Sequence, residues 1–122
     1  MAYWCLILAS LLSLASAAFH GYAGGNIYGG NIAASDLDPL TQSLSLVSWH
    51  IFTIFLIVSA FVLSWVAHYP LHKMAVYPTI AINVLGALLF VALGLAGHGE
   101  LMQMPGAYLM GGIAALSWMG VK

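Results

Sequence analysis

Apolar residues occur along this chain in four long runs, separated by shorter segments that hold most of its polar side chains. The runs cover about residues 2–19, 43–67, 74–97 and 105–119. Each is close to the roughly 20 residues that cross a bilayer core as an α-helix. Apolar and polar positions do not alternate within them, so the roughly 10-residue strands of a membrane barrel are not indicated.

The pattern therefore predicts an all-α integral membrane protein: a four-transmembrane-helix bundle, forming a single membrane domain over residues 1–122. Composition agrees, because 63% of the residues are hydrophobic and only 4% are charged. That leaves too little polar surface to cover a water-soluble globule of this length.

The first run has one feature of a secretory signal, because Ala15, Ser16 and Ala17 have the small-x-small form of a cleavage site. No Lys or Arg precedes the apolar residues, however, so we expect a spanning helix. Cys5 lies inside it. As the chain's one cysteine it cannot form an intrachain disulfide, and we expect it to be a small packing residue.

Residues 20–42 are rich in Gly and Asn and predict an extramembrane loop between the first two helices. Within them, Gly24-Gly25-Asn26-Ile27 recurs as Gly29-Gly30-Asn31-Ile32. The repeat lacks the Lys-Ser/Thr ending of a phosphate-binding loop. We favour a turn-rich cap outside the membrane over an ordered segment that packs on the bundle or on another subunit.

Charged residues separate into two groups if both termini lie on one side of the membrane. Lys73 and Lys122 then share that side, and Asp36, Asp38 and Glu100 lie on the other. The positive-inside bias predicts that both termini are cytoplasmic, and we expect a bacterial inner membrane.

Small residues in the third and fourth helices predict close helix packing, either within the chain or between copies of it. The glycines expected at these contacts are Gly86, Gly94, Gly111 and Gly112.

Polar side chains inside the predicted helices are the sharpest functional candidates, because such groups are costly in hydrocarbon unless they face protein or water. They are His50, Thr53 and Asn83. The face of His50 and Thr53 could line a pore, handle protons or contact a ligand. Alternatively, His50 forms a structural hydrogen bond to Asn83 or to a backbone carbonyl, and we favour this structural role.

A metal site is a weaker hypothesis. Imidazole and thioether groups would suit copper, imidazole and carboxylate would suit zinc or iron, and a haem would need two converging histidines. No pair of ligands has diagnostic spacing, so no cofactor is predicted. The candidate ligands on the predicted non-cytoplasmic half are His20, His50, His98, Glu100, Met102 and Met104.

Several classes of function have little support in the sequence. With two lysines and no arginine, the chain lacks the cations that bind nucleic acid. No serine lies in a nucleophile-elbow pattern and no acid lies in a predicted span, so we expect no enzyme. The sequence favours a non-catalytic accessory or scaffold subunit of a larger or homo-oligomeric membrane assembly, whose partners are the lipid bilayer and other subunits or copies. The alternatives are a homo-oligomeric channel using His50 and Thr53, and a metal- or haem-binding subunit.

Overall fold

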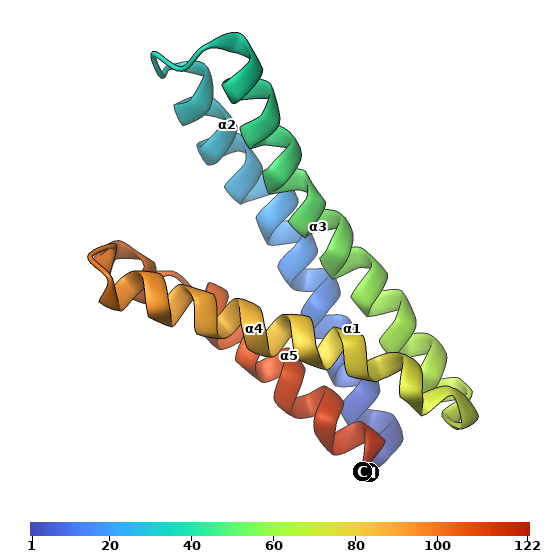
Figure 1. Ribbon diagram of the computed structural model, residues 1–122. Coiled ribbons are helices and arrows are strands. Elements are labelled where there is room, and N and C mark those ends of the chain that lie inside the picture. Colours follow the sequence, from blue (N-terminus) through green and yellow to red (C-terminus); the bar gives the residue numbers. More distant parts are fainter.

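A computed structural model describes all residues, 1–122, and the chain is helical throughout: 89% of it is helix and none is strand. Figure 1 shows the helices as two hairpins. The elements in chain order are α1 (Ala2–Ala18), the π-helical η1 (Phe19–Gly24), α2 (Gly25–Ala33), α3 (Pro39–His68), the 3-10 helix η2 (Pro70–Ala75), α4 (Val76–Leu95), the 3-10 helix η3 (Gly99–Gln103) and α5 (Gly106–Val121).

The first helix is longer than the sequence pattern predicts. α1, η1 and α2 form one uninterrupted helical stretch, Ala2–Ala33. The extramembrane loop predicted for residues 20–42 is therefore wrong, and the connection to α3 is confined to residues 34–38. The glycines were interpreted as turn formers, whereas here they let α2 approach α3 closely, a role that glycine often has in membrane helices.

α3 begins at Pro39, four residues before the predicted start at Ser43. Asp38 has an extended backbone and caps the helix, because its carboxylate accepts hydrogen bonds from the backbone N–H groups of Leu40 and Thr41. Proline at the first helical position suits this start, since its missing N–H would have no partner there. The helix ends at His68, shortly before Pro70, close to the predicted end.

α4 and α5 form the second hairpin, and their bounds lie within about two residues of those predicted. α4 ends where Gly97 takes a φ of +116°, a conformation that favours glycine. The two helices pack closely through small residues: a Cβ atom added at Gly86 would overlap the Met110 side chain. Gly94 is packed in the same way against Met102, so both glycines lie where the helices of this hairpin approach closely.

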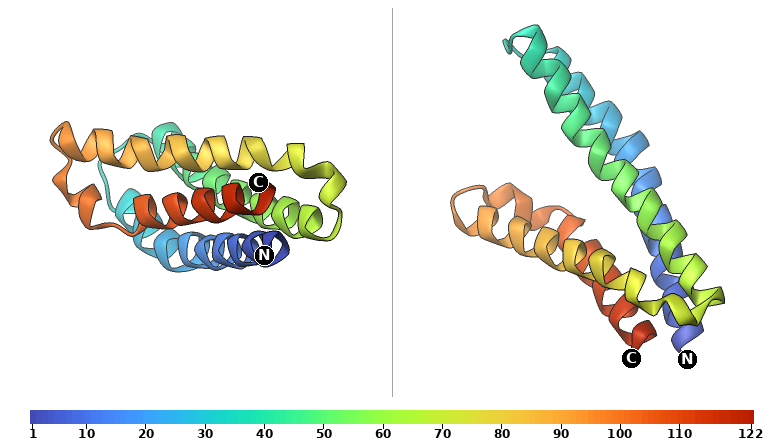
Figure 2. Two further views of the ribbon diagram at one scale, coloured as in Figure 1. Left: turned by 90° about the horizontal axis from the view of Figure 1, so that it is seen from below. Right: turned by 45° about the vertical axis from the view of Figure 1, so that its right-hand side comes forward.

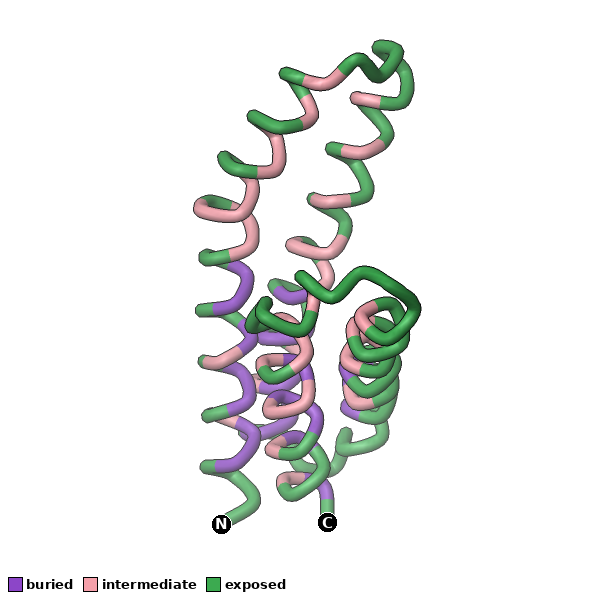
Figure 3. Tube along the Cα trace, turned by 90° about the vertical axis from the view of Figure 1, so that its left-hand side faces the viewer, coloured by how far each residue is buried: buried purple, intermediate pink, exposed green.

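The helices pack in the order α3, α1, α5, α4, and α3 barely touches α4 beyond their connecting turn. Figures 1 and 2 show the two hairpins diverging from the end where the chain termini lie. Figure 3 shows that the buried residues concentrate at that end. The core there includes Leu6, Leu56, Leu63, Val66 and Ile113.

Three helical stretches are long and apolar enough to cross a membrane: Ala2–Ala33, Pro39–His68 and Pro70–Leu95. The fourth apolar helix, α5, is shorter. Large hydrophobic side chains are exposed along all four helices. This combination is typical of a membrane protein in contact with a lipid bilayer.

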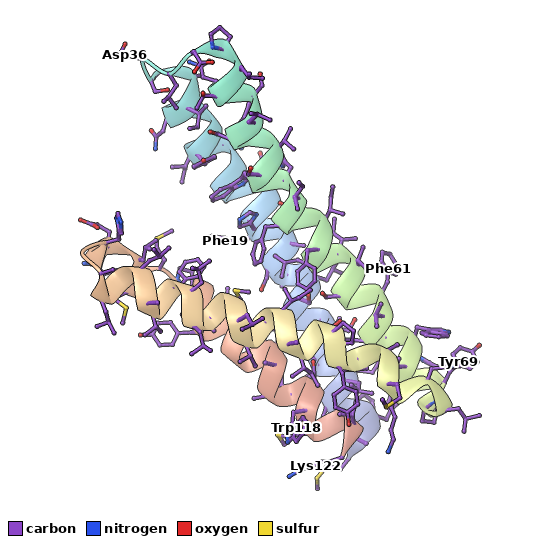
Figure 4. All side chains as sticks on the ribbon, in the orientation of Figure 1. Phe19, Asp36, Phe61, Tyr69, Trp118 and Lys122 are labelled. Carbon is purple, nitrogen blue, oxygen red and sulfur yellow. The ribbon has the colours of Figure 1, made fainter.

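Acidic and basic residues lie at different ends of the hairpins. Asp36 lies at the tip of the first hairpin, and Lys122 lies at the end where the termini meet (Figure 4). Lys73 belongs to η2, which joins the hairpins at that same end. Glu100 belongs to η3, at the far end of the second hairpin. The predicted separation of the two lysines from the three carboxylates is therefore present in the fold.

Candidate functional site

Within the first helical stretch, Ala2–Ala33, the α-helix changes to a π-helix over η1, and this turn carries His20. In a π turn the backbone hydrogen bond reaches five residues back, which widens the helix. The His20 carbonyl accepts one such bond from the Gly25 N–H. The same carbonyl accepts a second bond of 3.2 Å from the indole Nε1 of Trp49 on α3. The π turn thus supplies an acceptor for the one N–H that Trp49 must satisfy.

Three aromatic rings form a stack at this turn. The imidazole of His20 lies nearly parallel to the Trp49 indole, with ring centroids 4.0 Å apart. Tyr28 is stacked on Trp49 as well, at 4.3 Å. Because both rings are close to the indole centroid and parallel to it, Trp49 lies between them. We call Tyr28, Trp49 and His20 the ring stack; it joins α3 to both η1 and α2.

His20 and Thr53 are also hydrogen bonded, with 2.9 Å between the imidazole Nδ1 and the Thr53 hydroxyl oxygen. Phe52 meets the edge of the same imidazole at 5.1 Å. The Thr53 hydroxyl therefore forms a hydrogen bond within the first hairpin. The residue is half-buried, and it is not part of a free polar surface.

Glycines line the side of the first helix that faces the ring stack. Gly21, Gly25 and Gly29 are spaced by four residues, and Gly24 lies beside them. A Cβ at Gly24 would come within 2.8 Å of the Trp49 ring, and one at Gly21 within 2.9 Å of Thr53. Only glycine leaves room for these contacts, so this line of small residues positions the stack.

The ring stack lies about one hydrocarbon-core thickness from the terminal end of the molecule. At about 1.5 Å per residue, His20 is about 27 Å along the helix from Ala2, and Trp49 is about 28 Å from His68. A hydrocarbon core is about 30 Å thick. If the terminal end of the molecule lies at one membrane surface, the rings lie at the other, where aromatic side chains are common.

His50 follows Trp49 directly but has a different environment. Its side chain is exposed, and its Cε1 atom is 3.7 Å from the position of a Cβ on Gly25. Thr53 is turned to His20, so the two residues predicted to share one polar face differ in exposure and in contacts.

Asn83 lies in the core of the molecule, where its side chain is fully buried. Its amide Nδ2 donates to the Thr79 carbonyl one turn earlier, at 2.9 Å. The hypothesis of a hydrogen bond between His50 and Asn83 is therefore wrong. Serines make the polar contacts between α1 and α3 instead: Ser10 donates to the Ala60 carbonyl at 2.7 Å, and Ser13 to the Leu56 carbonyl at 2.9 Å.

The six candidate metal ligands do not come together. His20 and His50 belong to the first hairpin, whereas His98 and Glu100 lie at the far end of the second, and the hairpins diverge. Met102 packs against Gly94 in the second hairpin, and Met104 lies in the following turn. No group of three or more His, Cys, Asp or Glu side chains in the chain could hold a metal ion. His50 and His98 likewise lie on different hairpins, so the fold provides no haem site between them.

One face of α3 carries a row of exposed apolar side chains, which the sequence analysis did not identify. Its large apolar side chains recur with alternating spacings of four and three residues, the a and d pattern of a coiled coil. All eight are between 44% and 70% exposed, and Trp65, the last of them, stacks on His72 of η2. We call this face the α3 stripe: Leu40, Leu44, Val47, Ile51, Ile54, Val58, Phe61 and Trp65.

A second open surface runs between α4 and α5. It is an apolar groove of about 710 Å³. Gly111 lies in it, and a Cβ added there would touch nothing within 4 Å. Gly112, by contrast, is in ordinary contact range of Leu12 on α1. Of the two adjacent glycines predicted at helix contacts, Gly112 packs within the chain and Gly111 is open.

Comparison of the chain with protein-family models, with curated proteins and with solved structures gives no match.

Proposed function

We propose that this protein is a non-catalytic scaffold subunit of a membrane assembly, and that two copies pair along the α3 stripe. The observation that carries the proposal is the stripe itself: eight exposed apolar side chains with coiled-coil spacing along the whole of α3. Contact with lipid requires apolar side chains but no such spacing. Any one face of a helix recurs at three and four residues, and the strict alternation of four and three over the whole of α3 also meets what a facing helix requires.

The outer end of the stripe adds a second reason. α3 has 30 residues, so it is about 45 Å long, and it exceeds a hydrocarbon core of about 30 Å. Leu40 and Leu44 lie in this outer part. Both are exposed, and outside the hydrocarbon core they are stabilised only if another protein surface covers them.

A second copy fits this face because the chains share one orientation in the membrane. The two α3 helices then run parallel, and a two-fold axis brings each a or d position against its equivalent. Such an interface is closed at two copies. A pair of this kind leaves no central pathway, which favours the scaffold role over the homo-oligomeric channel.

Internal use of the polar groups supports the same role. His20 is hydrogen bonded to Thr53 through its imidazole and to Trp49 through its carbonyl, and Ser10 and Ser13 donate to backbone carbonyls of α3. These contacts stabilise the hairpin and leave no continuous polar wall along it for a solute.

The proposal includes a four-span topology. α5 has 16 residues and is about 24 Å long, which is short for a span. The 3-10 helix η3 and the turn at residues 104–105 come directly before α5 and add to the length of this fourth apolar segment. We propose that both termini and Lys73 lie on the cytoplasmic side of a bacterial inner membrane, with Asp36 and Glu100 on the other side.

Cysteine cross-linking tests the pairing. In a Cys5→Ala background, Val47→Cys, Ile51→Cys, Ile54→Cys and Val58→Cys should each give a disulfide-linked dimer in native membranes under mild oxidation. Leu46→Cys and Ile57→Cys are matched controls, because they lie at similar depths on the flanks of the stripe, and they should cross-link weakly.

Mass measurement after gentle detergent extraction provides a second readout. If two copies pair along the α3 stripe, the measured complex should contain two copies of the chain. Equal cross-linking at stripe and control positions, or none at either, would contradict the pairing. A closed ring of more than two identical copies would also contradict it and would favour permeation.

A further inference from the structure

The α4–α5 groove has the length of one lipid chain. Its lining runs from Ile80 to Val91 on α4 and from Trp118 back to Ala107 on α5. Eleven residues of helix correspond to about 16 Å. Half of a bilayer core is about 15 Å. The groove therefore matches the depth of one leaflet.

Both lysines of the chain lie near one end of this groove. Lys122 Nζ lies over the Trp118 ring, 5.7 Å from its centroid. Trp118 lines the groove and meets Tyr77 edge to face at 6.3 Å. Lys73 precedes Tyr77 by four residues, about one turn, in the helix that leads into α4. Trp118 thus links Lys122 to the groove, and Lys73 lies one helical turn before Tyr77, the aromatic neighbour of Trp118.

No carboxylate side chain is available at this end to neutralise the lysines. Asp36 and Asp38 lie at the tip of the first hairpin, and Glu100 lies at the far end of the second (Figures 1 and 4). Two lysines without an acidic side chain nearby, at one end of a mainly apolar groove, are complementary to a molecule with an anionic head and a hydrocarbon tail.

We propose that this surface binds one anionic phospholipid. The phosphate accepts hydrogen bonds from the ammonium groups of Lys73 and Lys122, and one acyl chain lies in the groove over Gly111. The site is on α4 and α5, separate from the α3 stripe, so it is independent of the pairing of copies. A partner helix would fill the groove but would bring no phosphate to the lysines, which is why the lipid is the better fit.

Lipid retention measured by native mass spectrometry tests the site. The full chain is purified, and phosphatidylglycerol and phosphatidylcholine with identical acyl chains are added in equal amounts. At about 1 kcal/mol for each lysine near a phosphate, the wild type should prefer phosphatidylglycerol by about 30-fold. Lys73→Gln combined with Lys122→Gln should abolish most of that preference, and both substitutions are on the surface.

A second variant tests the groove. Gly111→Leu fills it without meeting any atom of the chain at the Cβ position, and it should lower retention of both lipids by about tenfold or more. Gly30→Leu is the matched control, because Gly30 is also a helical glycine with open space around it, and retention should not change.

Inorganic phosphate in millimolar excess distinguishes a lipid site from a simple phosphate site. It should not displace the lipid, because it has no acyl chain for the groove. Equal retention of the two lipids by the wild type, full preference in the double glutamine variant, or displacement by inorganic phosphate would each overturn the proposal.

Discussion

At the scale of single residues, Trp49 shows how a large polar-edged ring is accommodated between membrane helices. A buried indole N–H without an acceptor costs about 1–3 kcal/mol. The π turn at His20 provides that acceptor, and the rings of His20 and Tyr28 cover both faces of the indole. His20 was predicted as a candidate site residue, but only as a metal ligand. Trp49 and Tyr28 were missed, because their contact depends on residues 20–33 being helical.

Asp38 is the residue whose charge has the clearest local role. The hydroxyl of Thr41, together with the backbone N–H groups of Thr41 and Leu40, donates to the carboxylate and holds the pKa of Asp38 below its usual range. A carboxyl with a lowered pKa in the folded state stabilises the fold above its ordinary pKa, and that stabilisation is lost as the pH falls through the folded value.

We therefore expect Asp38→Ala to lower the thermal midpoint at neutral pH, because α3 loses its N-cap. The difference from the wild type should shrink as the pH falls below the ordinary carboxyl range. Thermal unfolding of both proteins in detergent, at a series of pH values from neutral to acid, measures this difference in midpoint. Asp36→Ala is the control and should have little effect, since no helix cap involves it. A midpoint difference that is independent of pH would contradict the capping role.

At the scale of elements, the same residues support two different predictions, depending on whether their composition or their spacing is considered. The Gly-Gly-Asn-Ile repeat is rich in Gly and Asn, and this composition predicts turns. The spacing of four among Gly21, Gly25 and Gly29 indicates a packing face, and the structure contains this face. The a and d spacing of α3 was likewise readable from the sequence. Which face of α3 is free was not, because that depends on its packing against α1.

The two halves of the repeat offer a matched pair of substitutions. Gly24→Ala places a Cβ 2.8 Å from the Trp49 ring and should destabilise the protein by about 1–3 kcal/mol through overpacking. Gly30→Ala meets nothing and should be neutral or stabilising by up to about 1 kcal/mol, because alanine favours helix.

Equilibrium unfolding of both variants in the same detergent measures the difference. The tryptophan fluorescence of Gly24→Ala should also change, since Trp49 must move. Equal stability of the two variants would show that α2 does not pack on α3 as described.

At the scale of the whole molecule, the all-helical class and the ends of the later helices were predictable from the apolar runs. The separation of the lysines from the carboxylates was predictable too, because it follows from where the five charged residues lie between and after the apolar runs. The divergence of the two hairpins was not. It depends on which helices pack together, and small residues on every helix permit several arrangements.

Cysteine accessibility tests the four-span topology most directly. In the Cys5→Ala background, Asp36→Cys, Lys73→Cys and Gly99→Cys are labelled with a membrane-impermeant maleimide in intact cells and again after permeabilisation. We expect residues 36 and 99 to react in intact cells and residue 73 to react only after permeabilisation. Labelling of residues 36 and 73 from the same side would contradict the topology, and so would labelling of residues 36 and 99 from opposite sides.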